Sequence, residues 1–179
     1  MIIDNDRSKW FGASDTSKIM GSWQTKTFAL FWAEKLGLLQ NNYTSVAMKA
    51  GNAFEHRILE VVGVDRMDRQ IKIPKLRLRV NLDGEDNECI YEVKTHKGLY
   101  KVTSAHWQQA QVEMFAAKKM LDIVSYRLTE EDYNNFFNPI DQDRLDFHPI
   151  EYDKKWIETE YLPRLKLLRK ALRKGVFPV

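Results

Sequence analysis

The sequence predicts an α/β fold in which helices flank a mixed central β-sheet. Apolar residues recur every three or four positions towards both ends of the chain, which is the period of amphipathic helices. Between these ends, short segments rich in β-branched residues follow one another and are separated by turn-forming residues. With 179 residues, of which 44% are hydrophobic, the chain is the size of one globular domain. We therefore expect a single domain over residues 1–179.

Helices are expected at the start of the chain. Residues 14–39 predict two helices interrupted near Gly21, and Ser14 is placed to cap the first of them. The second of these helices has an apolar face of aromatic and leucine side chains. Residues 45–62 predict a further helix.

Three β-prone segments come next, at residues 69–73, 76–82 and 89–94. Residues 83–87 have the sequence Asp-Gly-Glu-Asp-Asn, which is typical of a turn between the last two segments. The three segments together predict a meander or a hairpin.

Helix and strand alternate in the second half of the chain. A helix is expected over residues 104–118 and a strand over residues 123–128, followed by a polar loop and a strand near residues 146–152. A long amphipathic helix closes the chain, with apolar positions between residues 157 and 172 and basic residues between them. This order of elements is that of an α/β protein with a mixed sheet.

The composition excludes several kinds of site. Cys89 is the single cysteine, so the chain can form no internal disulfide, no zinc site of several thiolates and no cysteine-ligated iron–sulfur cluster. The four histidines are scattered without an i, i+4 pair, which argues against a histidine metal site. Any bound metal is therefore expected on oxygen ligands.

Other function classes lack their characteristic residues. The sequence contains no P-loop, no glycine-rich dinucleotide turn and no G-x-S-x-G segment. The formal charge of +3 permits a polyanionic partner without requiring one. No apolar stretch is long enough to span a membrane and the first residues do not resemble a secretory signal, so we expect a soluble, cytoplasmic protein.

Three charged residues at the ends of the last two β-prone segments indicate a catalytic site. Asp83 ends one segment, while Glu92 and Lys94 end the next, so a hairpin brings them together. Because side chains alternate along a strand, Glu92 and Lys94 share a face and Val93 points into the core. Two carboxylates at short range repel each other unless a cation lies between them, and Mg²⁺ prefers oxygen ligands. The pattern therefore predicts a magnesium site suited to phosphodiester hydrolysis.

The same spacing leaves a structural alternative open. Asp83 and Gly84 also fit an ordinary turn, and Glu92 and Lys94 also fit the solvent side of an edge strand. In the catalytic interpretation, the carboxylates raise the pKa of Lys94. We then expect Lys94 to orient the attacking water and offset charge in the transition state, rather than to act alone as a general base.

Four segments around this pattern occur in a characteristic order. They are Arg7-Ser-Lys-Trp-Phe-Gly-Ala-Ser14, Gly51-Asn-Ala-Phe-Glu55, Asp83-Gly84 followed by Glu92-Val93-Lys94, and Gln109-Ala-Gln-Val-Glu-Met114. In this order they resemble the lambda-exonuclease, or YqaJ-like viral recombinase, family of PD-(D/E)xK nucleases, over about residues 7–172. Asn81-Leu82 stands where that family more usually has Ser/Thr-Pro.

The resemblance implies a restriction-endonuclease-like fold and a role for each matching residue. It implies that Arg7 and Ser14 hold the 5′ phosphate of a DNA end, where an Arg fork and a hydroxyl suit phosphate. It implies that Glu55 joins the metal site from a helix and that Gln109 bonds the water, Lys94 or the scissile phosphate. The implied metal ligands are Glu55, Asp83, Glu92 and the backbone carbonyl of Val93. They would hold one or two Mg²⁺ ions, with Mn²⁺ able to substitute.

The resemblance also implies an activity and partners. The implied enzyme is a metal-dependent exonuclease that degrades one strand of linear duplex DNA from its 5′ end and leaves single-stranded tails for recombination. The implied assembly is a homo-oligomer, typically a trimer, that works with a single-strand-annealing recombinase in a bacterial host and is encoded by a phage or prophage. A same-fold endonuclease and a non-catalytic protein that binds DNA ends are the alternatives. The basic closing helix fits a solvated face, with DNA-backbone binding as its alternative.

Overall fold

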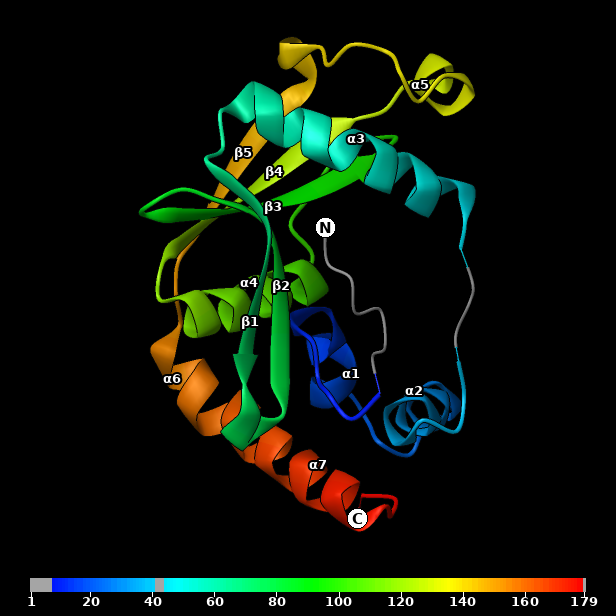
Figure 1. Ribbon diagram of the computed structural model, residues 1–179, viewed down its shortest axis with the longest axis vertical. Helices are drawn as coiled ribbons and strands as arrows, with labels where there is room; N and C mark the ends of the chain where they lie inside the picture. The colour runs from blue at the N-terminus through cyan, green and yellow to red at the C-terminus, as the bar shows by residue number, and fades with distance from the viewer. Residues whose placement is uncertain (1–7, 41–43, 179) are drawn as a thin grey trace.

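A five-stranded mixed β-sheet forms the centre of the computed structural model, which describes residues 8–40 and 44–178 (Figure 1). The strands lie in sequence order: β1 (Arg66–Ile73), β2 (Leu78–Glu85), β3 (Cys89–His96), β4 (Met120–Arg127) and β5 (Leu145–Ile150). Strands β3 and β4 are parallel, and every other neighbouring pair is antiparallel. The predicted mixed sheet and the predicted meander of its first three strands are thus confirmed.

Helices cover both faces of this sheet. They are α1 (Thr16–Met20), α2 (Lys26–Leu36), α3 (Val46–Val62), α4 (Ser104–Ala117), α5 (Glu130–Asn134), α6 (Lys154–Trp156) and α7 (Leu162–Lys174), with a π-helical turn at Ile157–Tyr161 between the last two. Over residues 8–40 and 44–178, no helix is long and apolar enough to cross a membrane.

Two apolar clusters hold these layers together. Helix α3 packs through Phe54 and Ile58 against Val93 and Val124 on one face of the sheet. The second cluster joins α4, α7 and the N-terminal helices to the other face, where Ile90 and other strand residues are buried. Figure 1 shows α3 lying across β3 and β4, with α4 and α7 on the other side of the sheet. Successive residues of β3 therefore face two different environments.

Strands β2 and β3 pair over a very short length. Their backbones match only at Gly84 with Tyr91 and at Glu85 with Ile90, after which they separate. Figure 1 shows the β1–β2 hairpin turning away from β3 below this point. Asp83 and Glu92 are the first residues beyond the paired segment. The strands therefore open at the position where the sequence predicts a catalytic site.

The turn between these strands lies later than the sequence predicts. Asp83 and Gly84 belong to β2, and the chain reverses after Asp86, whose Oδ1 accepts the N–H groups of Glu88 and Cys89 at 2.8 and 2.7 Å. Packing explains the error, because a Cβ on Gly84 would lie 2.7 Å from Leu59 Cδ2. The absence of a side chain at Gly84 lets α3 approach β2 closely, and the glycine is not part of a turn.

The predicted capping role of Ser14 is also wrong. Ser14 lies within a 3₁₀ turn (Ala13–Asp15), and α1 begins after it at Thr16. The carboxylate of Asp15 stabilises this turn instead, since it accepts the N–H of Gly12 at 2.8 Å. Asp15 also pairs with the buried ammonium of Lys35 at 2.6 Å.

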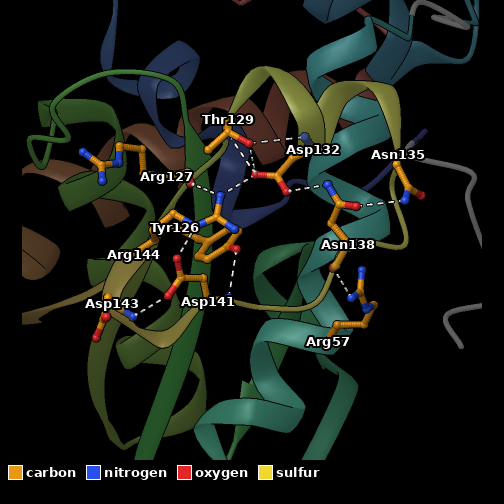
Figure 2. Close-up of polar contacts among 10 residues, drawn as sticks. All are labelled: Arg57, Tyr126, Arg127, Thr129, Asp132, Asn135, Asn138, Asp141, Asp143 and Arg144. Atoms are coloured by element: carbon orange, nitrogen blue, oxygen red, sulfur yellow. Dashed lines mark hydrogen bonds and ion pairs between the residues drawn. The ribbon is translucent and has the colours of Figure 1, made fainter.

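The segment after β4, expected to be a polar loop, contains α5 and a buried polar network (Figure 2). Asp132 accepts hydrogen bonds from Thr129 and Asn138 and pairs with Arg144 at 2.5 Å. Arg57 of α3 donates to backbone carbonyls of residues 136–138. The network fixes the loop between β4 and β5 against α3.

Candidate active site

A cavity of about 740 Å³ opens where β2 and β3 separate, between α3 on one side and α4 on the other. It is lined by the predicted site residues Ser14, Glu55, Asp83, Glu92, Val93, Lys94 and Gln109. Arg7, the other predicted phosphate-binding residue, lies outside the described residues. One cavity thus contains side chains that come from the N-terminal turn, two strands and two helices.

Asp83 joins the two separating strands. Its Oδ2 accepts the backbone N–H of Val93 at 2.9 Å, which holds the carboxylate beside β3. Desolvation raises the pKa of Asp83 well above its usual range, and the nearby charges of Glu92 and Glu55 raise it further. Burial and repulsion therefore destabilise the charged form of Asp83, and a cation beside the carboxylate would stabilise that form. The Val93 amide has a clear use here, and the role of its carbonyl as a metal ligand stays a prediction.

Lys94 and Gln109 surround the carboxylate of Glu92. Lys94 Nζ pairs with Glu92 Oε1 at 2.5 Å, and Gln109 Nε2 donates to the same oxygen. Lys94 Nζ also lies 3.5 Å from Gln109 Oε1. Burial acts to lower the pKa of Lys94, but the carboxylates of Glu92 and Asp83 outweigh it and raise that pKa. Lys94 is thus an ammonium group at neutral pH, as the sequence predicts, and cannot easily accept a proton.

Glu55 reaches the cavity from α3. Burial and then the charge of Glu92 raise its pKa. Candidate ligand atoms of Glu55, His56 and Asp68 also lie within 4.8 Å of one another, and His56 Nε2 pairs with Asp68 Oδ2 at 3.1 Å. Sequence reasoning missed Asp68, whose backbone has the left-handed value φ 57° inside β1. No spacing pattern predicts such a conformation for Asp.

Glu113 is a second residue that the sequence analysis missed. It is fully buried on α4, and its Oε1 accepts the Gln109 amide at 2.8 Å. Burial and the charge of Glu92 raise the pKa of Glu113 well above its usual range. Its position four residues after Gln109 puts the two on the same helix face, which is the signal that could have found it.

The donor set fits a hard divalent cation. Glu55, Asp83 and Glu92 present carboxylate oxygens to one cavity, and oxygen ligands are those that Mg²⁺ and Mn²⁺ prefer. Within the part of the chain that is described, Glu92 Oε2 is buried and has no hydrogen-bond partner. A buried acceptor without a partner is costly, so an ion at this oxygen would satisfy it. These residues could therefore hold a metal.

Two further residues of the matching segments have clear structural uses. A Cβ on Gly51 would lie 3.3 Å from Thr95 Oγ1, so this glycine lets α3 approach β3 closely. Gln111, in contrast, is buried away from the cavity. It donates to the carbonyl of Glu151 and accepts the N–H of Asp153, both at 2.7 Å. It ties α4 to the end of β5.

The fold of this chain also occurs in solved structures. No protein-family model and no curated protein match the chain. The crystal structure of the alkaline exonuclease LHK-Exo from Laribacter hongkongensis matches with a TM-score of 0.67 and 20% identity, covering 94% of this chain and 92% of that one. The structure of SSO0001 matches with a TM-score of 0.50 and 11% identity, covering 97% and 79%. The chain therefore shares its fold with an alkaline exonuclease over nearly its whole described length.

Proposed function

We propose that the protein is a magnesium-dependent DNA nuclease of the PD-(D/E)xK type. The observation that supports this most is the convergence of Glu55, Asp83 and Glu92 beside the ammonium of Lys94 in one cavity. Carboxylates whose pKa is raised by burial and by a neighbouring negative charge, as it is for Glu55 and Asp83, are poor choices for stabilising a fold, but they are good ligands for a cation. The shared fold with an alkaline exonuclease points in the same direction.

The side chains divide the work of phosphodiester hydrolysis. A divalent cation held by the carboxylates would polarise the phosphoryl group and shield its charge. Lys94 keeps its proton and stabilises negative charge as it develops on the phosphoryl oxygens. The side-chain nitrogen of Gln109 donates a hydrogen bond to Glu92, and its side-chain oxygen faces Lys94. Gln109 thus fixes the positions of both residues. The hydrogen bond from the Val93 N–H to Asp83 keeps the Asp83 carboxylate directed into the cavity with the other carboxylates.

The proposal extends to linear duplex DNA degraded from its 5′ end. Ser14 is exposed at the cavity and can donate to a terminal phosphate. We propose that Arg7 binds the same phosphate together with Ser14. We also propose that the protein forms a homo-oligomer, works with an annealing recombinase and is encoded by a phage or prophage. Arg7→Ala is then expected to slow cleavage of 5′-phosphorylated ends and to leave 5′-hydroxyl ends unaffected. Equal slowing on both would contradict end binding.

The decisive experiment compares end-labelled linear DNA with closed circular DNA in the presence of Mg²⁺. We expect the wild type to shorten the linear molecule and to leave the circle intact, and Lys94→Ala to lose about a hundredfold or more in rate. Lys170→Ala removes the same charge from an exposed position on α7 and serves as the matched control.

Each other outcome supports one of the alternatives. Cleavage of the closed circle would favour an endonuclease. Binding of DNA ends without cleavage, under varied divalent ions, would favour a non-catalytic end-binding protein. Equal activity of Lys94→Ala and Lys170→Ala would overturn the site itself.

A further inference from the structure

The β1–β2 hairpin has a polar face that leads away from the carboxylates. Along β2, residues buried in the apolar core alternate with three residues that line the cavity, which are Arg79, Asn81 and Asp83. Because side chains alternate along a strand, these three form one row. The row begins at Asp83 in the proposed catalytic site and ends at Arg79, four residues away, or roughly 13 Å at the usual rise of a strand.

Strand β1 supplies a second row beside the first. The register places Gln70 opposite Asn81 and Lys72 opposite Arg79. Gln70 Nε2 donates to Asn81 Oδ1 at 3.0 Å, so the middle of the face is neutral and ordered. The face therefore changes from acidic through neutral to basic along its length, and the exposed ammonium of Lys72 stands at the basic end.

An aromatic side chain lies at this basic end. Phe11 pairs with the start of β2 through hydrogen bonds of 2.8 Å to Arg77 and from Arg79, and its side chain is buried in the core. Its neighbour Trp10 is only partly buried and lines the cavity. Lys72 Nζ and Arg77 Cζ lie 5.8 and 5.9 Å from the centroid of the Trp10 ring. An indole with two cations beside it is thus held at the far end of the polar face.

This combination suits an unpaired nucleic-acid strand. Proteins that bind single strands use cations to follow the phosphates and aromatic rings on which bases stack. The acidic end of the face would repel phosphates unless a cation were bound there, whereas the basic end attracts them. A strand leaving the site would thus pass the carboxylates and their cation first, then the neutral amides, and finally the basic side chains and the indole ring.

We infer that an unpaired DNA strand lies along this hairpin face, with a phosphate at Lys72 and a base stacked on Trp10, while its scissile phosphate lies at the carboxylates. This inference rests on the proposed nuclease function for its orientation. The length of the face corresponds to about four nucleotide steps of roughly 3.4 Å. A strand of five or more nucleotides is then needed to reach both ends.

Binding of fluorescent oligothymidylates, measured by anisotropy in EDTA so that no cleavage occurs, tests this inference separately from catalysis. We expect Trp10→Leu to weaken binding of a ten-nucleotide strand about tenfold, since one stacked base is lost. Trp10→Phe keeps an aromatic face and should recover most of the affinity. Phe137→Ala removes an exposed aromatic ring from another loop and is the matched control.

The exposed Lys72 gives a second test that does not depend on a partly buried residue. Lys72→Gln should reduce the slope of log affinity against log salt by about 0.7, the value for one phosphate contact on a single strand. Lys26→Gln, at an exposed position of α2, should leave the slope unchanged. Equal slopes for the two variants, or equal affinity of Trp10→Leu and wild type, would overturn the inference even if DNA is cleaved. Trp10-dependent binding by a wild type that cleaves no DNA would instead overturn the proposed nuclease function.

Discussion

The buried carboxylate of Asp132 and the buried carboxylates of the cavity have pKa values that are shifted in opposite directions. Asp132 is 1% exposed and accepts hydrogen bonds from the N–H and hydroxyl of Thr129 and from Asn138, besides its ion pair with Arg144 (Figure 2). Burial alone would raise the pKa of Asp132, but these donors outweigh it and lower that pKa. The Asp132 carboxylate is fully satisfied by its own chain.

The carboxylates of the cavity are not satisfied in this way. Glu92 and Glu113 are 4% and 0% exposed, and within residues 8–40 and 44–178 the Oε2 atom of each has no hydrogen-bond partner. Burial and mutual repulsion raise the pKa values of Asp83 and Glu113. Buried polar groups are normally paired, so a cluster that lacks partners indicates a ligand. The comparison separates an acid whose charge is satisfied by the fold from acids whose charge the fold leaves unsatisfied.

The largest expected effect comes from Asp83→Asn. The amide retains the shape of the carboxylate and an oxygen for the Val93 N–H, but it removes a charged ligand from the cavity. We expect DNA cleavage to fall on the order of a thousandfold, while the melting temperature stays equal or rises. Rates at saturating Mg²⁺ and thermal unfolding check both parts. A large fall in melting temperature would mean that Asp83 belongs with Asp132 as a structural acid.

The opposite result is expected for Asp132→Asn. Loss of the charge leaves Arg144, whose side chain is 13% exposed, without its buried partner. We expect about 2 kcal/mol of lost stability, and unchanged cleavage per folded molecule. Denaturant unfolding measures the first quantity, and Asp143→Asn, at an exposed position, is the control. Cleavage that falls as far as in Asp83→Asn would contradict the distinction between the clusters.

A smaller effect is expected when the pH is changed. Because the pKa values of Glu55 and Asp83 are raised, protons compete with a cation for these oxygens at pH values above the usual range of carboxyl groups. Affinity for Mn²⁺ should therefore increase as pH rises through these pKa values, by up to about tenfold per pH unit for each proton released, and then level off. Titration calorimetry in two buffers of different ionisation enthalpy measures affinity and proton release together. Affinity independent of pH between 5 and 8 would argue against carboxylate ligands of raised pKa.

The smallest expected effect is a gain of stability in Glu113→Gln. A carboxyl whose folded pKa is raised binds its proton more tightly in the folded state, so its contribution to stability is present at low pH and lost as pH rises. Replacing Glu113 should thus raise the melting temperature by a few degrees at pH 8 and leave it unchanged near pH 4. Glu60→Gln, at an exposed position of α3, should do neither. A gain of equal size at both pH values would exclude repulsion as its cause.

Strand alternation and the order of elements were sufficient to predict much of the fold and the candidate site. The alternation of Glu92, Val93 and Lys94 places two side chains in the cavity and one in the core, as predicted. Glu55 and Gln109, suggested by resemblance alone, lie in the same cavity because α3 and α4 cover opposite faces of the sheet where β2 and β3 separate. Their roles, and those of the other site residues, remain predictions.

The errors and omissions have different physical causes. Asp83-Gly84 has the composition of a turn, but contact with Leu59 of α3 is what requires the glycine. Asp68 enters the cavity through a left-handed backbone conformation, which interrupts the simple alternation of β1. Glu113 is an acidic residue on the buried side of a helix, and its hydrogen bond from Gln109 is what connects it to the candidate site. The first case depends on a tertiary contact, the second on a local backbone conformation, and the third on a contact within α4.

Gly84 has a consequence for anyone who searches for inactive variants of this protein. A methyl group there would meet both Leu59 and Val64, at 2.7 and 2.9 Å, and would push α3 away from the sheet. Since α3 also bears Glu55, this steric displacement would disturb the cavity from a distance. A genetic screen for inactive variants would then recover substitutions at position 84 together with those at Asp83, although we propose a chemical role only for Asp83 and Gly84 contributes only the absence of a side chain.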